Sequence, residues 1–367
     1  MIRRFWLRVR RAITLRKVLK WSLASLLVAT LLLMSPVAYV ELGCRGQGGT
    51  QSYEPLVSDP VFQRREANTY LTYPEWHIVF AYDGLARALT TGDEHAFDYI
   101  RSILGFWSST CALTRVASQH GGADWDTRSM IHTIGVSFTA EMLVKAAYEE
   151  TMGRATAWLR GPRKTAQDAV IAVVATDYAA FLRQTPWYQY PFNRKAHELW
   201  AAPVDQFVRG WERRLAIGLE FEAKAVYAKV IADAVAATAP AQLVIRSVVS
   251  GLDATALRSI PGITVIDARG DAFEIETPRY DQFTRILADV ARQGGAIHEI
   301  AGNDEIMVSV TVREGVAVGQ HGTVILRMRR DGIPGERLLV NVRMPELAAF
   351  LNTYPLGEPG LEHVFDY

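Results

Sequence analysis

The longest apolar run in the sequence lies close to the N-terminus. Residues 21–40 read WSLASLLVATLLLMSPVAYV and contain no charged side chain. As a helix, such a run at about 1.5 Å per residue spans about 30 Å, the thickness of the hydrocarbon core of a bilayer. Residues 1–20 carry eight Arg and Lys and no acidic residue. By the positive-inside rule this pattern predicts a single-pass anchor over residues 21–41 of a bacterial inner membrane, with residues 1–20 in the cytoplasm and the bulk of the chain in the periplasm.

Two kinds of cleaved signal share this basic start and apolar middle. The run is longer than the apolar part of an ordinary signal peptide, and no small-x-small cleavage site follows it. A lipoprotein signal could end at Leu42-Gly43-Cys44, but Glu41 stands where that signal requires an apolar residue. We therefore expect the anchor to be retained.

Beyond a linker at residues 42–65, apolar positions recur at helical spacing. Ile78, Tyr82, Leu85 and Leu89 share one face of a helix. Further helices are expected over 95–107, 128–158, 165–183 and 204–237. Seven of the nine tryptophans lie between Trp76 and Trp211, and none follows. These patterns predict an aromatic-rich all-α bundle over residues 66–239.

Residues 240–367 instead contain short β-rich runs separated by Gly, Pro, Asn and Asp. The runs are LVIRSVVSG, TVIDA, AFEIET, AIHEIA and EIMVSVTVR, with helices expected over 253–259 and 280–293. The order strand, helix, strand, strand, helix, strand is ferredoxin-like. Extra strands are expected at 324–330 and 337–343, a short helix over 344–351, and a loop from 356. The predicted fold class is thus α+β: a transmembrane helix, an all-α bundle and a ferredoxin-like α/β sandwich with extra strands, without an internal repeat.

Composition and charge narrow the classes of partner. The sequence is 49% hydrophobic and 22% charged, as in folded globular proteins. Its net charge is +1, and because eight positive charges lie in residues 1–20, the remaining 347 residues carry −7. A nucleic-acid partner is therefore not expected, since phosphate binding needs a basic surface. The membrane, through residues 21–41, is the partner that the sequence predicts directly.

The two cysteines, Cys44 and Cys111, both lie on the predicted outer side. In an oxidising compartment they could close a disulfide that holds the segment after the anchor against the helical domain. Two unrelated buried thiols are the alternative. No CxxC, zinc-finger or c-type haem pattern is present.

The stretch Pro74-Glu75-Trp76-His77 has two interpretations. Thr72 and Glu75 have the spacing of a capping box, which predicts that a helix begins here. Alternatively, a carboxyl among aromatic rings is desolvated, and the raised pKa that follows suits a general acid. On a helix Glu75 and His77 are about 200° apart, so a catalytic partner would have to come from elsewhere in the fold.

The other candidates for chemistry are His132, inside a predicted helix, and Asp124, after a Gly-Gly loop. An envelope hydrolase or metal-dependent enzyme would use Glu75 as the acid, His132 or His77 as the second group, and Asp124 as a base or ligand. The sequence contains no HExxH, GxSxG, P-loop, GxGxxG or Glu-x-x-His motif. We therefore predict no metal site, and no particular cofactor is indicated.

Aromatic clusters are the remaining signal. Trp76, Trp107, Trp187 and Tyr188 would line a groove for sugar rings or acyl chains if they converge. The alternatives are that tryptophan fills the bundle core, or that it rests at the membrane interface. The leading hypothesis is an envelope protein whose helical domain binds a glycan, lipid or protein and whose C-terminal domain assembles or regulates it. The envelope enzyme is the second hypothesis.

Overall fold

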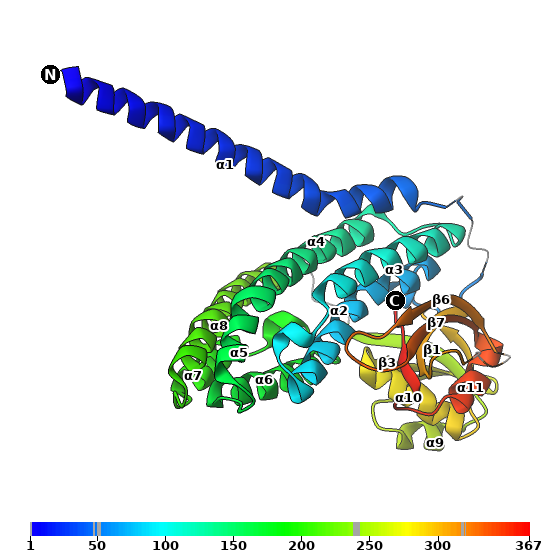
Figure 1. Cartoon of the computed structure of the whole chain (residues 1–367). Coiled ribbons are helices and arrows are strands. Elements are labelled where there is room, and N and C mark those ends of the chain that lie inside the picture. Colours follow the sequence, from blue (N-terminus) through cyan, green and yellow to red (C-terminus); the bar gives the residue numbers. More distant parts are fainter. Residues whose placement is uncertain (1, 47, 50–52, 238–242, 317–318, 320) are drawn as a thin grey trace.

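The computed structural model describes residues 2–46, 48–49, 53–237, 243–316, 319 and 321–367. The chain is mixed helix and sheet: one long N-terminal helix, a helical half, and a C-terminal half with two four-stranded antiparallel sheets (Figure 1). The predicted domain join at 239/240 falls within residues 238–242, outside the described residues.

The N-terminal helix α1 (Ile2–Gly43) projects from the body of the molecule (Figure 1). Its segment Leu19–Gly43 is long and apolar enough to cross a membrane, with a mean hydropathy of 2.1 over its most apolar window. A signal sequence would satisfy the same criterion. Side chains such as Leu27 and Leu31 are exposed in the folded chain, so this helix is not a core helix of the body.

Seven further helices form the described part of the helical half. They are α2 (Glu66–Thr91), α3 (Tyr99–Gln119), α4 (Trp125–Tyr148), α5 (Arg154–Arg160), α6 (Ala166–Leu182), α7 (Phe192–Ala201) and α8 (Phe207–Ala237). A π-helical turn, Glu149–Gly153, joins α4 to α5, and 3-10 turns lie at Pro60–Phe62, Glu94–Ala96 and Trp187–Gln189. The helix predicted over 128–158 is therefore two helices separated by an irregular turn.

The predicted helix start at Thr72 is wrong. Helix α2 begins two turns earlier, at Glu66, and Arg65 is its N-cap with extended backbone. The Thr72 hydroxyl donates to the carbonyl of Thr69 at 2.7 Å, and Pro74 lies inside the helix. The first turns of α2 bury Tyr70 and Leu71 against the rest of the molecule, and this tertiary packing stabilises a helix that the local pattern does not predict.

The first sheet contains β1 (Val244–Ser250), β2 (Thr264–Arg269), β3 (Ala272–Pro278) and β4 (Ala296–Ile300), in the order β2-β3-β1-β4. Helix α9 (Ala254–Ser259) follows β1, and α10 (Asp281–Arg292) follows β3. All neighbouring strands are antiparallel. Strands and helices thus alternate as the sequence predicts.

The second sheet contains the two strands expected as extras and corrects one expectation, the loop from residue 356. It contains β5 (Glu305–Val312), β6 (Thr323–Arg329), β7 (Glu336–Arg343) and β8 (Gly360–Val364), in the order β6-β7-β5-β8, with α11 (Met344–Thr353) before β8. The strands expected as extras do not extend the first sheet. The tail expected as a loop contributes a strand, because Leu361 and Val364 are buried. The two sheets repeat one strand order, so the topology is duplicated although the sequence shows no repeat.

Two apolar cores lie on opposite faces of the second sheet. Helices α10 and α11 pack together and share a core with both sheets, which includes Phe283, Phe350 and Val340. On the other face, Leu339 joins the core of the helical half together with Trp76 of α2. The second sheet therefore contributes one face to the core of the helical half and the other face to the core of the C-terminal half.

Residues 53–65 connect α1 to α2 across the polar face of the first sheet. The backbone N–H of Val57 donates to the buried Glu299 carboxylate at 2.7 Å. The guanidinium of Arg246 lies 3.7 Å from the ring centroid of Phe62. The predicted linker is therefore a packed segment over this range.

Candidate functional site

The junction between α1 and the body is held by ionic and covalent contacts. The Glu41 carboxylate accepts from Arg128 at 2.6 Å and lies 2.8 Å from Nε2 of His132, both on α4. The structure joins Cys44 and Cys111 in a disulfide, which ties the end of α1 to α3. Helix α1 is thus fixed to two helices of the body. His132, predicted as a catalytic group, belongs to this junction.

Three other predicted site residues, Asp124, Trp76 and Trp107, form contacts that stabilise the fold. Asp124 caps α4 by accepting from the backbone N–H of Thr127 at 2.8 Å, and this hydrogen bond lowers the pKa of Asp124. Trp76 is 6% exposed and stacks on His363 with 3.5 Å between ring centroids. Trp107 is 5% exposed and donates to the hydroxyl of Thr139 at 2.8 Å. Trp76 and Trp107 therefore fill the core, and neither ring face is free to stack on a ligand.

Trp187 and Tyr188 lie in a 3-10 turn and are half-buried. The Trp187 ring packs against Tyr227 of α8, with 5.3 Å between centroids. The structure thus does not gather the four predicted aromatic residues into one groove.

Glu75 lies half-buried on α2. Among the described residues it forms no hydrogen bond or ion pair. Burial raises the pKa of Glu75 to about 7; the charge of Arg279 opposes this shift and that of Asp366 adds to it. Asp366 itself pairs with Arg279 at 3.0 Å.

Tyr280 interacts electrostatically with both Glu75 and Tyr188. Tyr280 immediately precedes α10 and has a φ of 68°, a conformation that costs free energy for a bulky residue. Burial raises the pKa of the Tyr280 hydroxyl, Arg279 opposes the shift, and Asp366, Glu75 and Tyr188 add to it. The ionisable groups that interact with Glu75 are therefore those of Arg279, Tyr280 and Asp366, and not the histidines that the sequence suggested.

His77 points away into the core of the helical half. Its Nε2 lies 2.9 Å from the carbonyl oxygen of Ser102 and 4.0 Å from the Asp331 carboxylate. Burial lowers the pKa of His77, with Asp331 opposing the shift. This histidine contributes to packing between α2, α3 and the β6–β7 turn.

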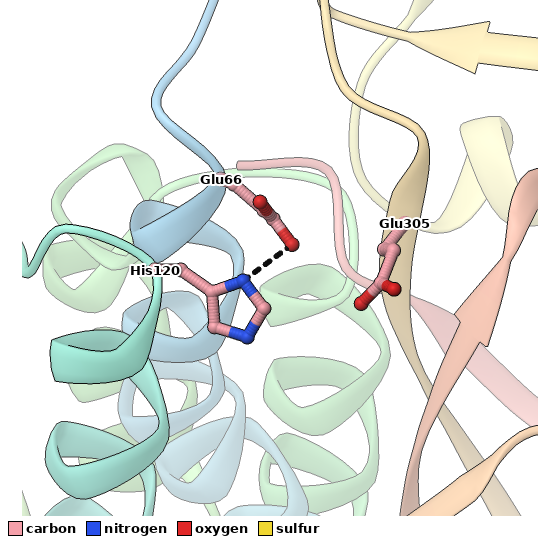
Figure 2. Close-up of side chains that lie close together, drawn as sticks. All are labelled: Glu66, His120 and Glu305. Carbon is pink, nitrogen blue, oxygen red and sulfur yellow. Dashed lines mark ion pairs between the residues drawn. The ribbon is translucent and has the colours of Figure 1, made fainter. Parts of the chain in front are cut away.

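A cluster that the sequence did not predict contains Glu66, His120 and Glu305 (Figure 2). Nδ1 of His120 lies 2.7 Å from Oε1 of Glu66, and one ligand atom from each of the three residues lies within 4.8 Å of the others. Glu66 is buried, whereas His120 and Glu305 are half-buried. Glu66 is the first residue of α2, His120 follows α3, and Glu305 is the first residue of β5. No local motif contains these residues, so only the fold brings them together.

A second unpredicted feature is an apolar face on the outside of the helical half. It is formed by exposed side chains on α8 and α5, namely Phe207, Val208, Trp211, Leu215, Leu219, Trp158 and Leu159. Trp158 is 81% exposed and Phe207 is 77% exposed. We call this set the α5/α8 face. Large exposed apolar surfaces of proteins are often sites of contact with a membrane or another molecule.

Comparison with known proteins adds no assignment. No protein-family model, no curated protein and no solved structure matches this chain. The function is therefore inferred from the geometry described above.

Proposed function

We propose that this chain is a single-pass, membrane-anchored protein of the bacterial envelope whose body lies in the periplasm. Its helical half binds lipid at the surface of the membrane that anchors it. The observation that carries this proposal is the junction: Glu41 pairs with α4, and Cys44 is bridged to α3. A body attached in this way stays beside the bilayer, whereas a body on a flexible tether would not.

The α5/α8 face supports the choice of lipid as the partner. Arg154 and Arg163 flank the exposed Trp158 and Leu159 in the sequence, and Arg214 lies 5.2 Å from the ring centroid of Trp211. Exposed aromatic and aliphatic side chains mixed with Arg are typical of surfaces that rest in the headgroup region. For the C-terminal half we propose a ferredoxin-like module over β1–β4, duplicated in outline by β5–β8, with a role in assembly or regulation.

Accessibility of single cysteines to an impermeant maleimide tests the orientation. The two native cysteines are bridged and do not react. In bacterial cells with a permeabilised outer membrane, Asp271→Cys should be labelled, whereas Lys17→Cys should react only after the inner membrane is lysed. The opposite pattern would overturn the proposed orientation.

Lipid contact is tested on the full chain reconstituted in vesicles that contain phosphatidylglycerol. An environment-sensitive dye on Leu215→Cys should shift to the blue and be quenched by brominated lipid. The same dye on Asp271→Cys, at an exposed turn of the first sheet, should remain in water. Equal, water-like emission at both positions would exclude lipid contact by the α5/α8 face.

The second candidate is an envelope hydrolase, and the observation that favours it is Glu75. A carboxyl with a pKa of about 7, and with no ion-pair partner in the part of the chain that the structure describes, has the protonation behaviour of a general acid. Asp366 and Tyr280 would be its neighbours in the reaction. Hydrolysis of a glycan or ester substrate by the native chain, abolished in Glu75→Gln without loss of stability, would favour this candidate over the binding protein.

A further inference from the structure

The cluster around His120 has the composition of a metal site. It offers one imidazole nitrogen and two carboxylates, donors that Zn²⁺ and other divalent transition metals accept. In a tetrahedral zinc site with bonds of about 2.0–2.1 Å, ligand atoms lie about 3.4 Å apart. The three ligand atoms here already lie within 4.8 Å of one another, so a small closing movement would complete the geometry.

The side chains that would ligate the metal are themselves held by second partners. The Tyr70 hydroxyl lies 3.3 Å from Nε2 of His120, the nitrogen left over when Nδ1 takes a metal. The amide of Asn341 donates to one oxygen of Glu305 and leaves the other oxygen for a ligand bond. Such outer partners fix the orientation of histidine and carboxylate ligands in metal sites.

Among the described residues, each of the two carboxylates of the cluster has one ion-pair partner. Asp304, the residue before Glu305, adds a third acidic side chain to this part of the chain. The partners are His120, when protonated, and Arg343, 4.0 Å from Glu305, and Arg65, next to Glu66 in the chain, donates to the carbonyl of Gly121 at 3.1 Å. Because a histidine that binds a metal is neutral, the cation itself would supply the counter-charge for Glu66 that protonated His120 provides without it.

From this arrangement we infer that Glu66, His120 and Glu305 bind one divalent transition-metal cation, with Zn²⁺ as the best fit. The single nitrogen and two oxygen donors leave a fourth position open to water or to a ligand. Magnesium is disfavoured because it prefers six oxygen ligands in octahedral geometry.

The ligands come from three separate parts of the chain, as Figure 2 shows: the start of α2, the end of α3 and the start of β5. A bound cation therefore joins the helical half to the second sheet, next to the segment that leads from the membrane helix. Binding of the metal stabilises this arrangement, by a free energy that grows with the logarithm of the metal concentration divided by Kd.

Equilibrium dialysis of the full chain in detergent against Zn²⁺, followed by elemental analysis, tests the site. The native chain should bind one Zn²⁺ at micromolar or lower concentration. Glu66→Gln, His120→Asn and Glu305→Gln should each weaken binding at least tenfold. Absence of stoichiometric Zn²⁺ from the native chain, or undiminished binding by His120→Asn, would overturn the site.

The matched control is His132→Asn. His132 also faces a glutamate, Glu41, at 2.8 Å, but Arg128 already neutralises that carboxylate and no third ligand is present among the described residues. Zn²⁺ binding should survive this substitution, and an equal loss in both histidine variants would show that the effect is not local. Because Glu305→Gln replaces the carboxylate of a half-buried side chain by an amide of nearly the same shape, it keeps the test valid if His120→Asn does not fold. Thermal unfolding without metal checks the fold of each variant.

Discussion

Some ionisable side chains in this protein are buried, and burial makes their charged form costly in free energy. Glu75 shows the consequence most simply. Its pKa in the folded chain, about 7, lies above the ordinary value of 4.5. Between these two pH values the folded chain keeps a proton that the unfolded chain has lost. Stability therefore falls as the pH rises through this window.

Glu75→Gln should remove the free-energy cost of ionising this half-buried carboxyl. We expect the variant to be more stable than the native chain at pH 8, by about 1 kcal/mol after allowance for the solvent that reaches this half-buried side chain. At pH 4.5 the two should be nearly equal. Urea unfolding at both pH values measures the difference, and Glu314→Gln, at an exposed carboxylate, controls for the loss of one acidic group. A stability gain that does not depend on pH would contradict the assignment.

At the scale of elements, the helices of the N-terminal half are joined by buried ion pairs as well as by apolar contacts. Arg209 and Arg213 on α8 are fully buried, and their partners include Glu94, Glu149 and Asp168. Nη1 of Arg213 lies 3.0 Å from Glu94 and 2.9 Å from Glu149. The π turn after α4 places Glu149 in this network.

Arg213→Ala should therefore lower the free energy of unfolding by about 3–5 kcal/mol, because it leaves buried carboxylates without their counter-charge. Arg154→Ala is the control: Arg154 pairs with Glu150 on the surface, and its loss should cost less than about 1 kcal/mol. Chemical denaturation of the three proteins provides the comparison. Similar losses in both variants would mean that the buried network contributes no more than a surface pair.

The sequence predicts most elements but few of these contacts. Apolar spacing and turn residues are sufficient to predict the alternation of strands and helices through β4. Glu141 and Lys145 have the i, i+4 spacing that predicts a surface ion pair, but Glu141 pairs with Lys224 of α8 at 2.7 Å, and Lys145 with Glu220 at 2.7 Å. A helix carries the same i, i+4 pattern whether its neighbour is solvent or another helix.

The cluster of Glu66, His120 and Glu305 was the least predictable part of the structure, because it too depends on contacts between distant segments. Glu66, His120 and Glu305 lie far apart in the sequence, and each has an ordinary local setting. Conversely, Trp76 and Trp107 stand out in the sequence because of their size, and that size is used in the core. Packing between residues that are distant in the sequence decides these roles. The periodicity of apolar residues along the chain gives no information about such packing.

At the scale of the whole molecule, the disulfide ties the end of α1 to α3 of the body. Replacing both cysteines, Cys44→Ser with Cys111→Ser, removes a covalent closure across 67 residues. We expect a loss of about 2–4 kcal/mol in stability. Residues 53–65 should also become more sensitive to protease, because only the noncovalent contacts of residues such as Val40, Glu41 and Gly43 then hold the end of α1.

A reducing agent should reproduce this effect in the native chain and have none in the double variant. Limited proteolysis and thermal unfolding, each with and without dithiothreitol, make the comparison. A native chain that is insensitive to dithiothreitol under conditions that reduce the bond would show that the disulfide does not fix the junction.

The second sheet has a further consequence, which concerns the order of folding. Residues near 70 on α2 pack against strands that follow residue 300, and Thr69 donates to the carbonyl of Phe365 at 3.1 Å. Contacts between such distant segments slow folding, because a long loop must close before they form. During synthesis the helices of the N-terminal half are made before the second sheet. Trp76 therefore stays exposed until the strands of that sheet have been made and pack against α2. The two halves should then unfold together in one cooperative transition.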